Sequence, residues 1–595
     1  MKTRVLIGLL FFLATHSFAQ TDSAGERITG RVTSAKDRSA LPGVSVSVKG
    51  STQGTVTDAE GRFALAVPPA GTLVFSYIGY LFKEVIVKSG SNGVDVALEE
   101  DAKELSELVV VGYGQQTRQS LTGSVASVTA ADIRDIPVPS TDQLLQGKTT
   151  GVQVTANSGV PGGGIFIRVR GTNSVNAGND PLYVIDGVFI NNTNLITTGL
   201  GNQVASNPLA DLNPADIESI QVLKDANATA IYGSRGANGV VLITTKRGKV
   251  NARSRINFST YQGWSQAAKK YEVVTGPQLA ELENERHLND GGDPTRLPFP
   301  NPADEPTYDR ISDLFRTART SDYELSVTGG NEKTTFYVGG GYFRQESVVQ
   351  PSNFERYSAR VNLDHFFSDR LKVGTSNALA RTGRNVSSND NNPTGVINSG
   401  LYPRSNLPVF NTDGSYALYG NFDNHLALIN HLNNDAVGHR VISNVYAEYT
   451  FFEGLSLRSS WSIDFNDAYE NNYTNTFISA GRASQGRAVS ALTRDITLLN
   501  EQVLSYRKEF GERHRLYALV GNTIQKNTFG RTTLNGQQFP SNDFQTIASS
   551  ATQTGSSSRS AAGLVSYFGK VNYSYLNRYS LEGSLRADAS SRFGA

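Results

Sequence analysis

The C-terminal part of the chain alternates apolar and polar residues over segments of about ten residues, the length of a tilted membrane strand. The alternation is clear at residues 357–364, 455–465 and 579–588. In the first of these the apolar positions are Tyr357, Ala359, Val361 and Leu363, and the polar ones are Ser358, Arg360, Asn362 and Asp364. Since successive side chains of a strand point to opposite faces, each segment has one apolar and one polar face. A soluble β-sandwich can alternate similarly, but its strands are typically shorter.

Residues 250–595 are therefore expected to form an antiparallel transmembrane β-barrel with a polar lumen. The short connections 452–454 and 576–578 are expected to be turns at one end of the barrel. The longer polar stretches 288–310, 384–395 and 466–490 are expected to be loops at the other end. At about 30 residues per hairpin this part provides about a dozen strands, against the ~22 of the large plugged barrels. Because the last residues stop inside or just after a strand, the barrel is expected to be incomplete in this chain.

The N-terminus has the pattern of a secretory signal peptide. Lys2 and Arg4 are basic, the apolar run 5–14 is too short to span a bilayer, and Ser17 and Ala19 give a small-x-small cleavage site. We therefore expect residues 1–19 to be a signal peptide and not a membrane anchor. Past them no apolar run approaches the ~20 residues of a membrane helix, so the mature chain can enter a membrane only as β-strands.

Composition excludes several functions. A net charge of +1 argues against nucleic acid as a partner, and the absence of Cys excludes disulfides, thiol catalysis and Cys-ligated metals. The seven His form no HExxH motif. Gly147-Lys148-Thr149 resembles the end of a P-loop, but Asp142 stands where that motif needs glycine. Asp186 precedes Gly187 and is expected to form a turn rather than to act as an acid or base. We expect no enzyme, no cofactor and no metal site.

Residues 26–99 have the pattern of a small all-β module. Val44, Val46 and Val48 alternate with polar residues, as a half-buried strand requires. A turn at 58–61 leads to a further strand at 62–67. Roughly seven short strands at this spacing predict a β-sandwich.

The segment 181–248 predicts a compact α/β domain. Asn213 can cap a short helix with proline at its first position, and Asp225 can cap a second helix that Gly233 stops. Residues 217–223 and 240–245 are expected to be strands.

With GVPGGGIFIRVRGTNS at 159–174 and LVVVGYG at 108–114, this segment resembles the plug of TonB-dependent outer-membrane transporters, and more closely the SusC/RagA type. The resemblance implies a plug domain at 115–248 and the outer membrane of a Gram-negative bacterium as the location. The pattern ITGRV…LPGVSVSVKG…GTVTDAEGRFAL is similar to the carboxypeptidase-regulatory-like domain that precedes the plug in this family. That module would lie in the periplasm and carries no peptidase site. The expected fold is mainly β: a β-sandwich, an α/β plug and a partial transmembrane barrel.

Residues 100–114 are expected to be a linker that ends in a TonB-box-like segment. The segment consists of Leu108, Val109, Val110, Val111 and Gly112. By resemblance, its main chain would pair with the edge of a TonB sheet in the periplasm, so that force is transmitted without particular side chains. The alternative is an ordinary first strand of the plug.

Three plug arginines are candidates for contacts with the barrel. Arg168 and Arg170 alternate with Ile167 and Val169, which gives this strand a cationic face. Inside a polar lumen their guanidinium groups could make forked hydrogen bonds to wall carboxylates. The alternative is solvated charge on a surface strand. Arg235 is assigned the same plug–barrel role.

The resemblance implies an active nutrient importer. Cargo bound by the extracellular loops and the outer plug surface would release the 108–112 segment to TonB, whose inner-membrane motor proteins use the proton gradient. A SusD-type surface lipoprotein is the expected partner, and an oligosaccharide or peptide the expected cargo. The alternative is a surface adhesin built of β-modules, without transport. A glycan-degrading enzyme ranks last because no acid/base pair is evident.

Overall fold

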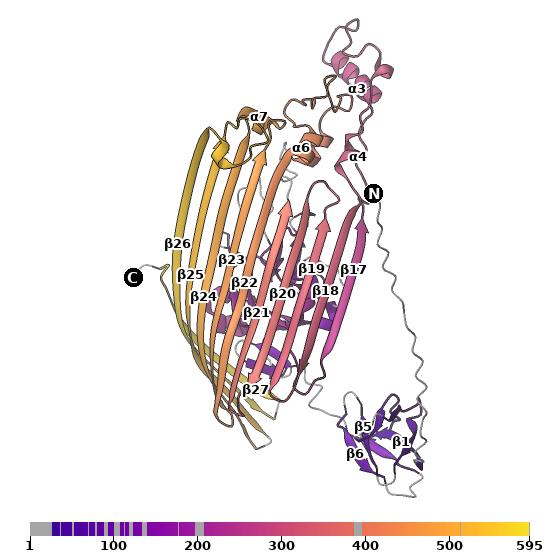
Figure 1. The fold of residues 1–595 in the computed structure, drawn as a ribbon, viewed down its shortest axis with the longest axis vertical. Coiled ribbons are helices and arrows are strands. Elements are labelled where there is room, and N and C mark those ends of the chain that lie inside the picture. Colours follow the sequence, from indigo (N-terminus) through magenta and orange to yellow (C-terminus); the bar gives the residue numbers. More distant parts are fainter. Residues whose placement is uncertain are drawn as a thin grey trace, which may run out of the picture. The chain divides into compact units, whose positions relative to one another are not determined.

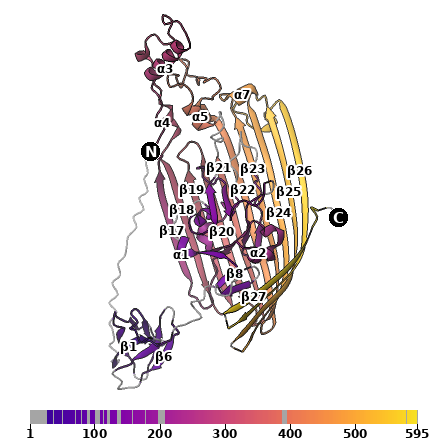
Figure 2. The ribbon, with the colours of Figure 1, turned by 180° about the vertical axis from the view of Figure 1, so that it is seen from behind.

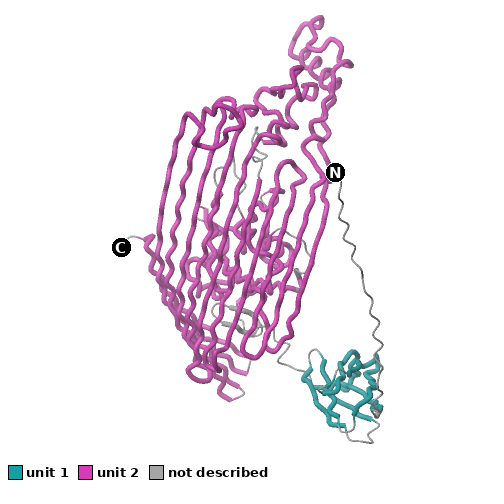
Figure 3. Tube along the Cα trace, viewed as in Figure 1, with its two compact units in different colours: residues 1–108 teal, residues 109–595 magenta. Residues whose placement is uncertain are grey.

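The computed structural model describes residues 26–593 except for positions 36, 50, 52, 69–70, 78–79, 88–92, 100–107, 112–113, 118–122, 134–139, 157, 176–177, 197–206, 386–394, 512 and 577. The predicted signal peptide 1–19 and Gly112 lie outside the described residues. The chain divides into two compact units, residues 1–108 and residues 109–595 (Figure 3). In the described part, no helix combines the length and the apolar character needed to cross a bilayer.

The first unit is a β-sandwich of two sheets. Its described strands are β1 (Glu26–Ser34), β2 (Ser45–Val48), β3 (Gly54–Val56), β4 (Arg62–Val67), β5 (Thr72–Ser76), β6 (Lys83–Ile86) and β7 (Val96–Leu98). They are arranged in the orders β4-β1-β7 and β3-β2-β5-β6. The predicted apolar face is confirmed, since Val44, Val46 and Val48 are buried in a core that residues of both sheets share.

The plug region of the second unit is built on a five-stranded mixed sheet in the order β10-β15-β16-β13-β14. Its strands are β10 (Val125–Thr129), β13 (Leu182–Ile185), β14 (Val188–Ile190), β15 (Ile217–Leu223) and β16 (Val240–Thr245). The strands β11 (Val152–Ala156) and β12 (Ile165–Val169) form a separate hairpin. The short helices are α1 (Ala130–Ile133), η2 (Thr141–Leu145), η3 (Pro214–Asp216), α2 (Ala226–Thr229) and η4 (Ala230–Gly236).

Local sequence signals account for the part of the plug from Asn213 to Thr245. The strands β15 and β16 cover the residues predicted for them. The predicted cap is confirmed, because the Asn213 side chain accepts a hydrogen bond from the Ala215 amide at 3.0 Å. Gly233, with φ of 66°, breaks the helical path inside η4. Asp225 precedes α2 but makes no capping hydrogen bond, and its carboxylate instead accepts one from the Ser124 amide at 2.5 Å.

The rest of the second unit is one antiparallel sheet of eleven strands in sequence order, which we term the wall (Figure 1). Its strands are β17 (Arg255–Ser265), β18 (Ala318–Gly330), β19 (Thr334–Glu346), β20 (Asn353–Phe366), β21 (Leu371–Asn385), β22 (Leu432–Phe452), β23 (Leu455–Thr474), β24 (Arg487–Phe510), β25 (His514–Gln537), β26 (Thr552–Tyr575) and β27 (Tyr579–Ser590). Among the described strands β17 and β27 each have one neighbour, and the sheet is curved around the plug elements (Figure 2).

The predicted alternation is confirmed on β20. Tyr357, Val361 and Leu363 are exposed on the outer face of the wall, whereas Arg360 and Asn362 are buried on its inner face. The strand lengths were predicted wrongly, because β22 to β26 have 20 to 24 residues instead of about ten. For the same reason the predicted loop 466–490 is too long: β23 continues to Thr474 and β24 begins at Arg487.

Long connections gather at one end of the wall and short turns at the other (Figure 1). The long ones contain α3 (Gly276–Asn289), η5 (Pro302–Asp304), α4 (Arg310–Leu314), α5 (Val396–Leu401), α6 (His425–His431), α7 (Ser479–Ala483) and η6 (Ile547–Ser549). Several pack on one apolar cluster that includes Ile311, Val396, Leu428 and Ile478. The buried Arg310 guanidinium also donates hydrogen bonds to the carbonyls of Arg404 at 2.8 Å and Leu407 at 3.0 Å. Separate loops therefore form one layer.

Candidate functional site: the interface between plug and wall

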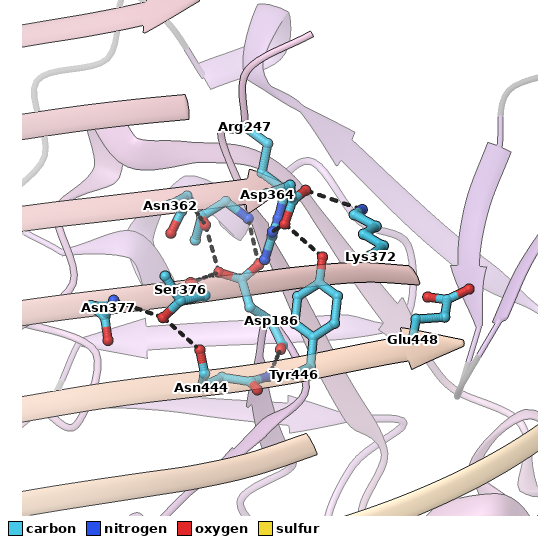
Figure 4. A network of polar contacts seen from close by, with 12 residues as sticks. Asp186, Arg247, Asn362, Asp364, Lys372, Ser376, Asn377, Asn444, Tyr446 and Glu448 are labelled. Carbon is cyan, nitrogen blue, oxygen red and sulfur yellow. Dashed lines mark hydrogen bonds and ion pairs between the residues drawn. The ribbon is translucent and has the colours of Figure 1, made fainter. Parts of the chain in front are cut away.

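The tight turn between β13 and β14 carries a buried carboxylate to the wall. Asp186 and Gly187 have φ of 48° and 89°, as a two-residue hairpin turn requires, so the predicted turn is confirmed. The Asp186 carboxylate also accepts hydrogen bonds from the Thr245 amide at 3.0 Å and from Ser376 Oγ of β21 at 2.7 Å (Figure 4). Asn444 of β22 donates to the Asp186 carbonyl at 3.0 Å. One turn thus contacts two wall strands.

Arg360 of β20 lies between two plug carboxylates. Its guanidinium is 3.5 Å from Asp186 Oδ2 and 3.2 Å from Asp216 Oδ2, and its side chain is only 2% exposed. Tyr337 of β19 donates a further hydrogen bond to Asp216 at 2.8 Å. Burial by itself would raise the pKa of Asp186, but the positive charges of Arg360 and Arg247 and the hydrogen bonds from Thr245 hold it below its usual value. The Asp186 carboxylate is therefore charged and paired in the assembled unit.

The end of the plug is fixed to the wall by a second cluster (Figure 4). Arg247 pairs with Asp364 of β20 at 2.9 Å, and Asp364 also accepts from the Tyr446 hydroxyl at 2.6 Å and pairs with Lys372 at 3.2 Å. Asn362 donates to the Lys246 carbonyl at 2.7 Å. The last residues of the plug therefore have side-chain partners on β20, and Asp364 links Arg247 to Lys372 of β21 and Tyr446 of β22.

Other buried arginines of the wall donate to main-chain carbonyls of the plug. Arg356 donates to Ala210 at 3.0 Å, Arg440 to Pro208 at 2.6 Å, and Arg586 to Ile231 at 2.6 Å. Arg440 is also held by two 2.9 Å hydrogen bonds to Asp464 of the neighbouring wall strand. In these contacts the wall supplies the cation and the plug supplies the acceptor.

The prediction that Arg168 and Arg170 contact the wall is wrong. Arg168 pairs with Asp180, and Arg170 pairs with Asp225 at 2.5 Å, so both partners belong to the plug and not to the wall. The reason is topological: β12 pairs with β11, and its cationic side chains meet carboxylates of neighbouring plug segments. Arg235, in contrast, donates a hydrogen bond to Gln525 of β25, and its guanidinium lies 4.2 Å from the centre of the Phe189 ring.

Two wall glycines, Gly339 and Gly341, leave space for side chains of the Asn213–Asp216 turn of the plug. A Cβ on Gly341 would lie 2.7 Å from the Asn213 amide nitrogen, and one on Gly339 would lie 2.9 Å from Asp216 Oδ1. A larger residue at either position would require these side chains to move. The run VGGGYF at 338–343 is easily seen in the sequence, but nothing in it indicates a contact with the plug. The plug turn that it contacts lies more than a hundred residues earlier in the chain.

The TonB-box-like segment lies outside the five-stranded plug sheet. Leu108–Val111 forms β8, which pairs with β9 (Gly114–Thr117) in a two-stranded sheet of its own. The first strand of the plug sheet is β10. Residues 108–111 are therefore not part of the five-stranded sheet. Binding of TonB to this segment and its alternative, an ordinary first strand of the plug, both stay predictions.

The interface is closed. Between the Asp211–Asp216 segment, β20, β21 and β22, the packing leaves a cavity of only ≈ 10 Å³, room for about one water molecule. No group of three or more His, Asp or Glu residues in the described part of the chain is placed to hold a metal ion. In this state the interface holds the plug in place and provides no path along the wall at this point.

One carboxyl inside the plug is held without a full set of partners. Asp142 of η2 is 1% exposed; its Oδ2 accepts from Ser140 Oγ at 3.4 Å, and its Oδ1 has no partner among the described residues. Burial raises the pKa of Asp142 from 3.8 to about 7, partly opposed by hydrogen bonds from Asn207 and Ser140. The folded plug therefore binds a proton that the unfolded chain releases between about pH 4 and pH 7.

Asp142→Asn should stabilise the plug increasingly as the pH rises from about 4 to about 7, and by a constant amount above that. The stability that the protonated group contributes is complete below about pH 4 and is lost as the pH rises through about 7. We expect no difference from the parent protein near pH 4 and a gain on the order of 2–4 kcal/mol at pH 8. Hydrogen exchange of the η2–β11 amides, corrected for intrinsic rates, measures it. Asp413→Asn, in an exposed loop, is the control, and equal protection of variant and parent at pH 8 would contradict the assignment.

Comparison with known proteins agrees with this architecture. Residues 117–240 match the TonB-dependent Receptor Plug Domain family, and residues 28–110 match the CarboxypepD_reg-like domain family. The chain is 35% identical to TonB-dependent receptor P26 of Formosa agariphila, over 93% of this chain and 55% of that protein. It is 33% identical to TonB-dependent receptor SusC of Bacteroides thetaiotaomicron, over 100% of this chain and 59% of SusC. The chain thus spans somewhat more than half the length of these relatives.

The fold is also similar to a solved structure. The structure of the RagAB peptide importer in the "open-open" state aligns with a TM-score of 0.70 and 26% identity, over 82% of this chain and 57% of that one. A plug enclosed by a curved antiparallel sheet of long strands defines a plugged β-barrel protein. The chain belongs to the TonB-dependent receptors and is of the SusC/RagA type.

Proposed function

We propose that the protein is an outer-membrane importer that takes up a nutrient with energy supplied through TonB. The observation that carries the proposal is the division of the plug. Among the described residues, the side-chain contacts between plug and wall involve residues 186–247 and Gly162, whose carbonyl accepts from Arg384 of β21 at 3.4 Å. The TonB-box-like strand β8 precedes all of these plug residues in the chain.

A pull on β8 would reach the plug through β10. Among the described strands it is at the edge of the plug sheet and pairs with β15 alone, from Val125 opposite Leu223 to Thr129 opposite Ser219. Removing an edge strand leaves the other four strands paired. The proposed movement is therefore separation of β10 and the segments before it, while the part from Asp186 to Arg247 stays fixed to the wall. The opening that results would connect the loop layer with the periplasm.

A disulfide across β10 and β15 tests the movement. The chain has no Cys, so Ser127→Cys with Gln221→Cys, at directly opposite positions, introduces a single pair within bonding range. We expect the oxidised protein to lose uptake and the reduced protein to regain it. Ser456→Cys with Ser505→Cys, whose hydroxyls are 3.0 Å apart on two wall strands, is the matched control. Undiminished uptake by the oxidised β10–β15 pair would overturn the mechanism.

The same proposal includes the partners. We expect TonB and its motor proteins on the periplasmic side, a SusD-like lipoprotein over the loop layer, and an oligosaccharide or a peptide as cargo. The similarity to the RagAB peptide importer supports a peptide, and the oligosaccharide is the cargo that the resemblance to the SusC type implies. The proposed role is transport and not catalysis. A surface adhesin is the second candidate, and it would bind cargo without any uptake that reduction could restore.

A further inference from the structure

A row of charged side chains crosses the outer face of the wall, the face turned away from the plug. Its cations are Arg319, Arg344, Arg381, His439, Arg494 and Arg559, and its carboxylates are Glu346, Glu355 and Asp467. The register places the central members side by side: Arg381 is opposite His439, His439 opposite Asp467, and Asp467 opposite Arg494. Alternation along each strand fixes the face, since the adjacent Arg440 and Asp495 contact the plug on the inner side.

Within this row the carboxylates are less exposed than the cations. Asp467 is 15% exposed and lies 3.1 Å from His439 Nδ1 and 3.4 Å from an Arg494 nitrogen, while these two partners are 51% and 49% exposed. Glu355 pairs with Arg381 at 3.3 Å in the same manner. Each of these pairs engages one nitrogen of the arginine, and a guanidinium carries five N–H donors. The carboxylates therefore orient the cations and leave donor capacity toward the outside.

The row lies at a boundary along the strands. Toward the end with the short turns, the outer face is mainly apolar and exposed, with Val445, Trp461, Leu498, Ile524 and Val565. Toward the loop layer the same face is mixed, with Asp435, Ser490 and Ser557 beside the exposed Tyr469, Leu492 and Leu534. An apolar band that ends in a charged row matches the boundary between the hydrocarbon and the headgroups of a bilayer. It also explains the long strands, which continue beyond the bilayer.

We propose that this row binds the phosphate groups of anionic lipids in the outer leaflet. Arginine recognises phosphate by paired hydrogen bonds, and the five arginines of the row outnumber its three carboxylates. Arg381 and Arg494 are three strand spacings apart, about 14 Å. The row thus suits a headgroup with two phosphates, or two neighbouring lipids. The inference requires that the wall lies in a membrane, and it is independent of import.

Lipid binding by the whole protein in a non-ionic detergent tests the row. The probe is an acylated glucosamine disaccharide with two phosphates, and its dephosphorylated form is the comparison, both followed by native mass spectrometry. The test variant combines Arg381→Gln, Arg494→Gln and Arg559→Gln, and we expect it to bind the phosphorylated probe at least about tenfold more weakly, because three charge-assisted contacts are lost. The control removes three exposed loop arginines, with Arg296→Gln, Arg404→Gln and Arg482→Gln.

The outcomes are distinct. Loss of binding in the row variant, retention in the loop variant and weak binding of the dephosphorylated probe together support the assignment. Equal binding of both probes by the parent protein would mean that only acyl chains are held, and equal binding by the row variant would place the phosphates elsewhere; either result overturns the proposal. Unchanged circular dichroism and uptake show that the row variant is folded. Since uptake does not depend on the row, failure of this test leaves the proposed import function standing.

Discussion

Val110→Pro is expected to abolish uptake while cargo still binds at the cell surface. Proline removes the main-chain donor of residue 110 and fixes φ near −65°, so β8 can no longer pair as a regular strand with a TonB sheet. A lost main-chain hydrogen bond costs about 0.5–1.5 kcal/mol, and the fixed φ adds to this cost, which predicts a loss of uptake on the order of tenfold or more. In the proposed mechanism cargo binds at the extracellular loops and the outer plug surface, so cargo binding should change little. The measurement is uptake of labelled cargo compared with binding to energy-depleted cells.

Val110→Thr is the matched control for this experiment. Threonine keeps the β-branched shape and the amide donor and changes only the polarity of the side chain. If pairing through the main chain transmits the force, the threonine variant should import at a rate close to that of the parent. Normal uptake by the proline variant would contradict the proposal that Leu108–Val111 is the TonB-binding segment. A similar loss in both variants would instead point to recognition of the side chain.

Arg360→Gln is expected to destabilise the seating of the plug by about 3–5 kcal/mol, the usual effect of removing one partner of a buried ion pair. The substitution leaves Asp186 and Asp216 buried with one charge-neutral partner in place of the guanidinium. The expected result is faster hydrogen exchange in β13 to β16 and increased leakage of small solutes through the protein. Arg515→Gln, whose guanidinium is 48% exposed and pairs with Glu509 at 3.1 Å, should change stability by less than about 1 kcal/mol.

A second substitution separates charge from packing. In the Arg360→Gln background, Asp216→Asn replaces one of the two carboxylates that have lost the guanidinium partner, so part of the lost stability should return. If the double variant is as unstable as the single one, the contribution of Arg360 is its volume and not its charge. If Arg360→Gln leaves exchange and leakage unchanged, the plug is held by other contacts, and the division of the plug that underlies the proposed mechanism is wrong.

Features encoded by neighbouring residues were predictable from the sequence. The strands at 217–223 and 240–245, the Asn213 cap and the Asp186–Gly187 turn each depend on a few adjacent residues and agree with the structure. The extent of β22 to β26 was not predictable from membrane thickness, because these strands continue past the apolar band.

Contacts between distant segments were predicted poorly. Arg168 and Arg170 were expected to meet the wall because a cationic strand face suggested carboxylates opposite it. Nothing in the local pattern reveals that Asp180 and Asp225 are nearer. Equally, Arg360 is one of many inward-facing residues of a wall strand, and its role depends on two plug turns that only the fold brings together.

The position of Arg360 in the chain has a consequence for the order of assembly. Asp186 and Asp216 belong to the plug, which leaves the secretion machinery first, whereas their common cation belongs to β20 and emerges more than a hundred residues later. Until then the two carboxylates must remain hydrated, because burying them without a counter-charge is strongly unfavourable. The plug can therefore complete its fold only when wall strands close around it. A plug without its barrel lacks the cation that the wall supplies. A barrel without its plug lacks the carboxylates that the plug supplies.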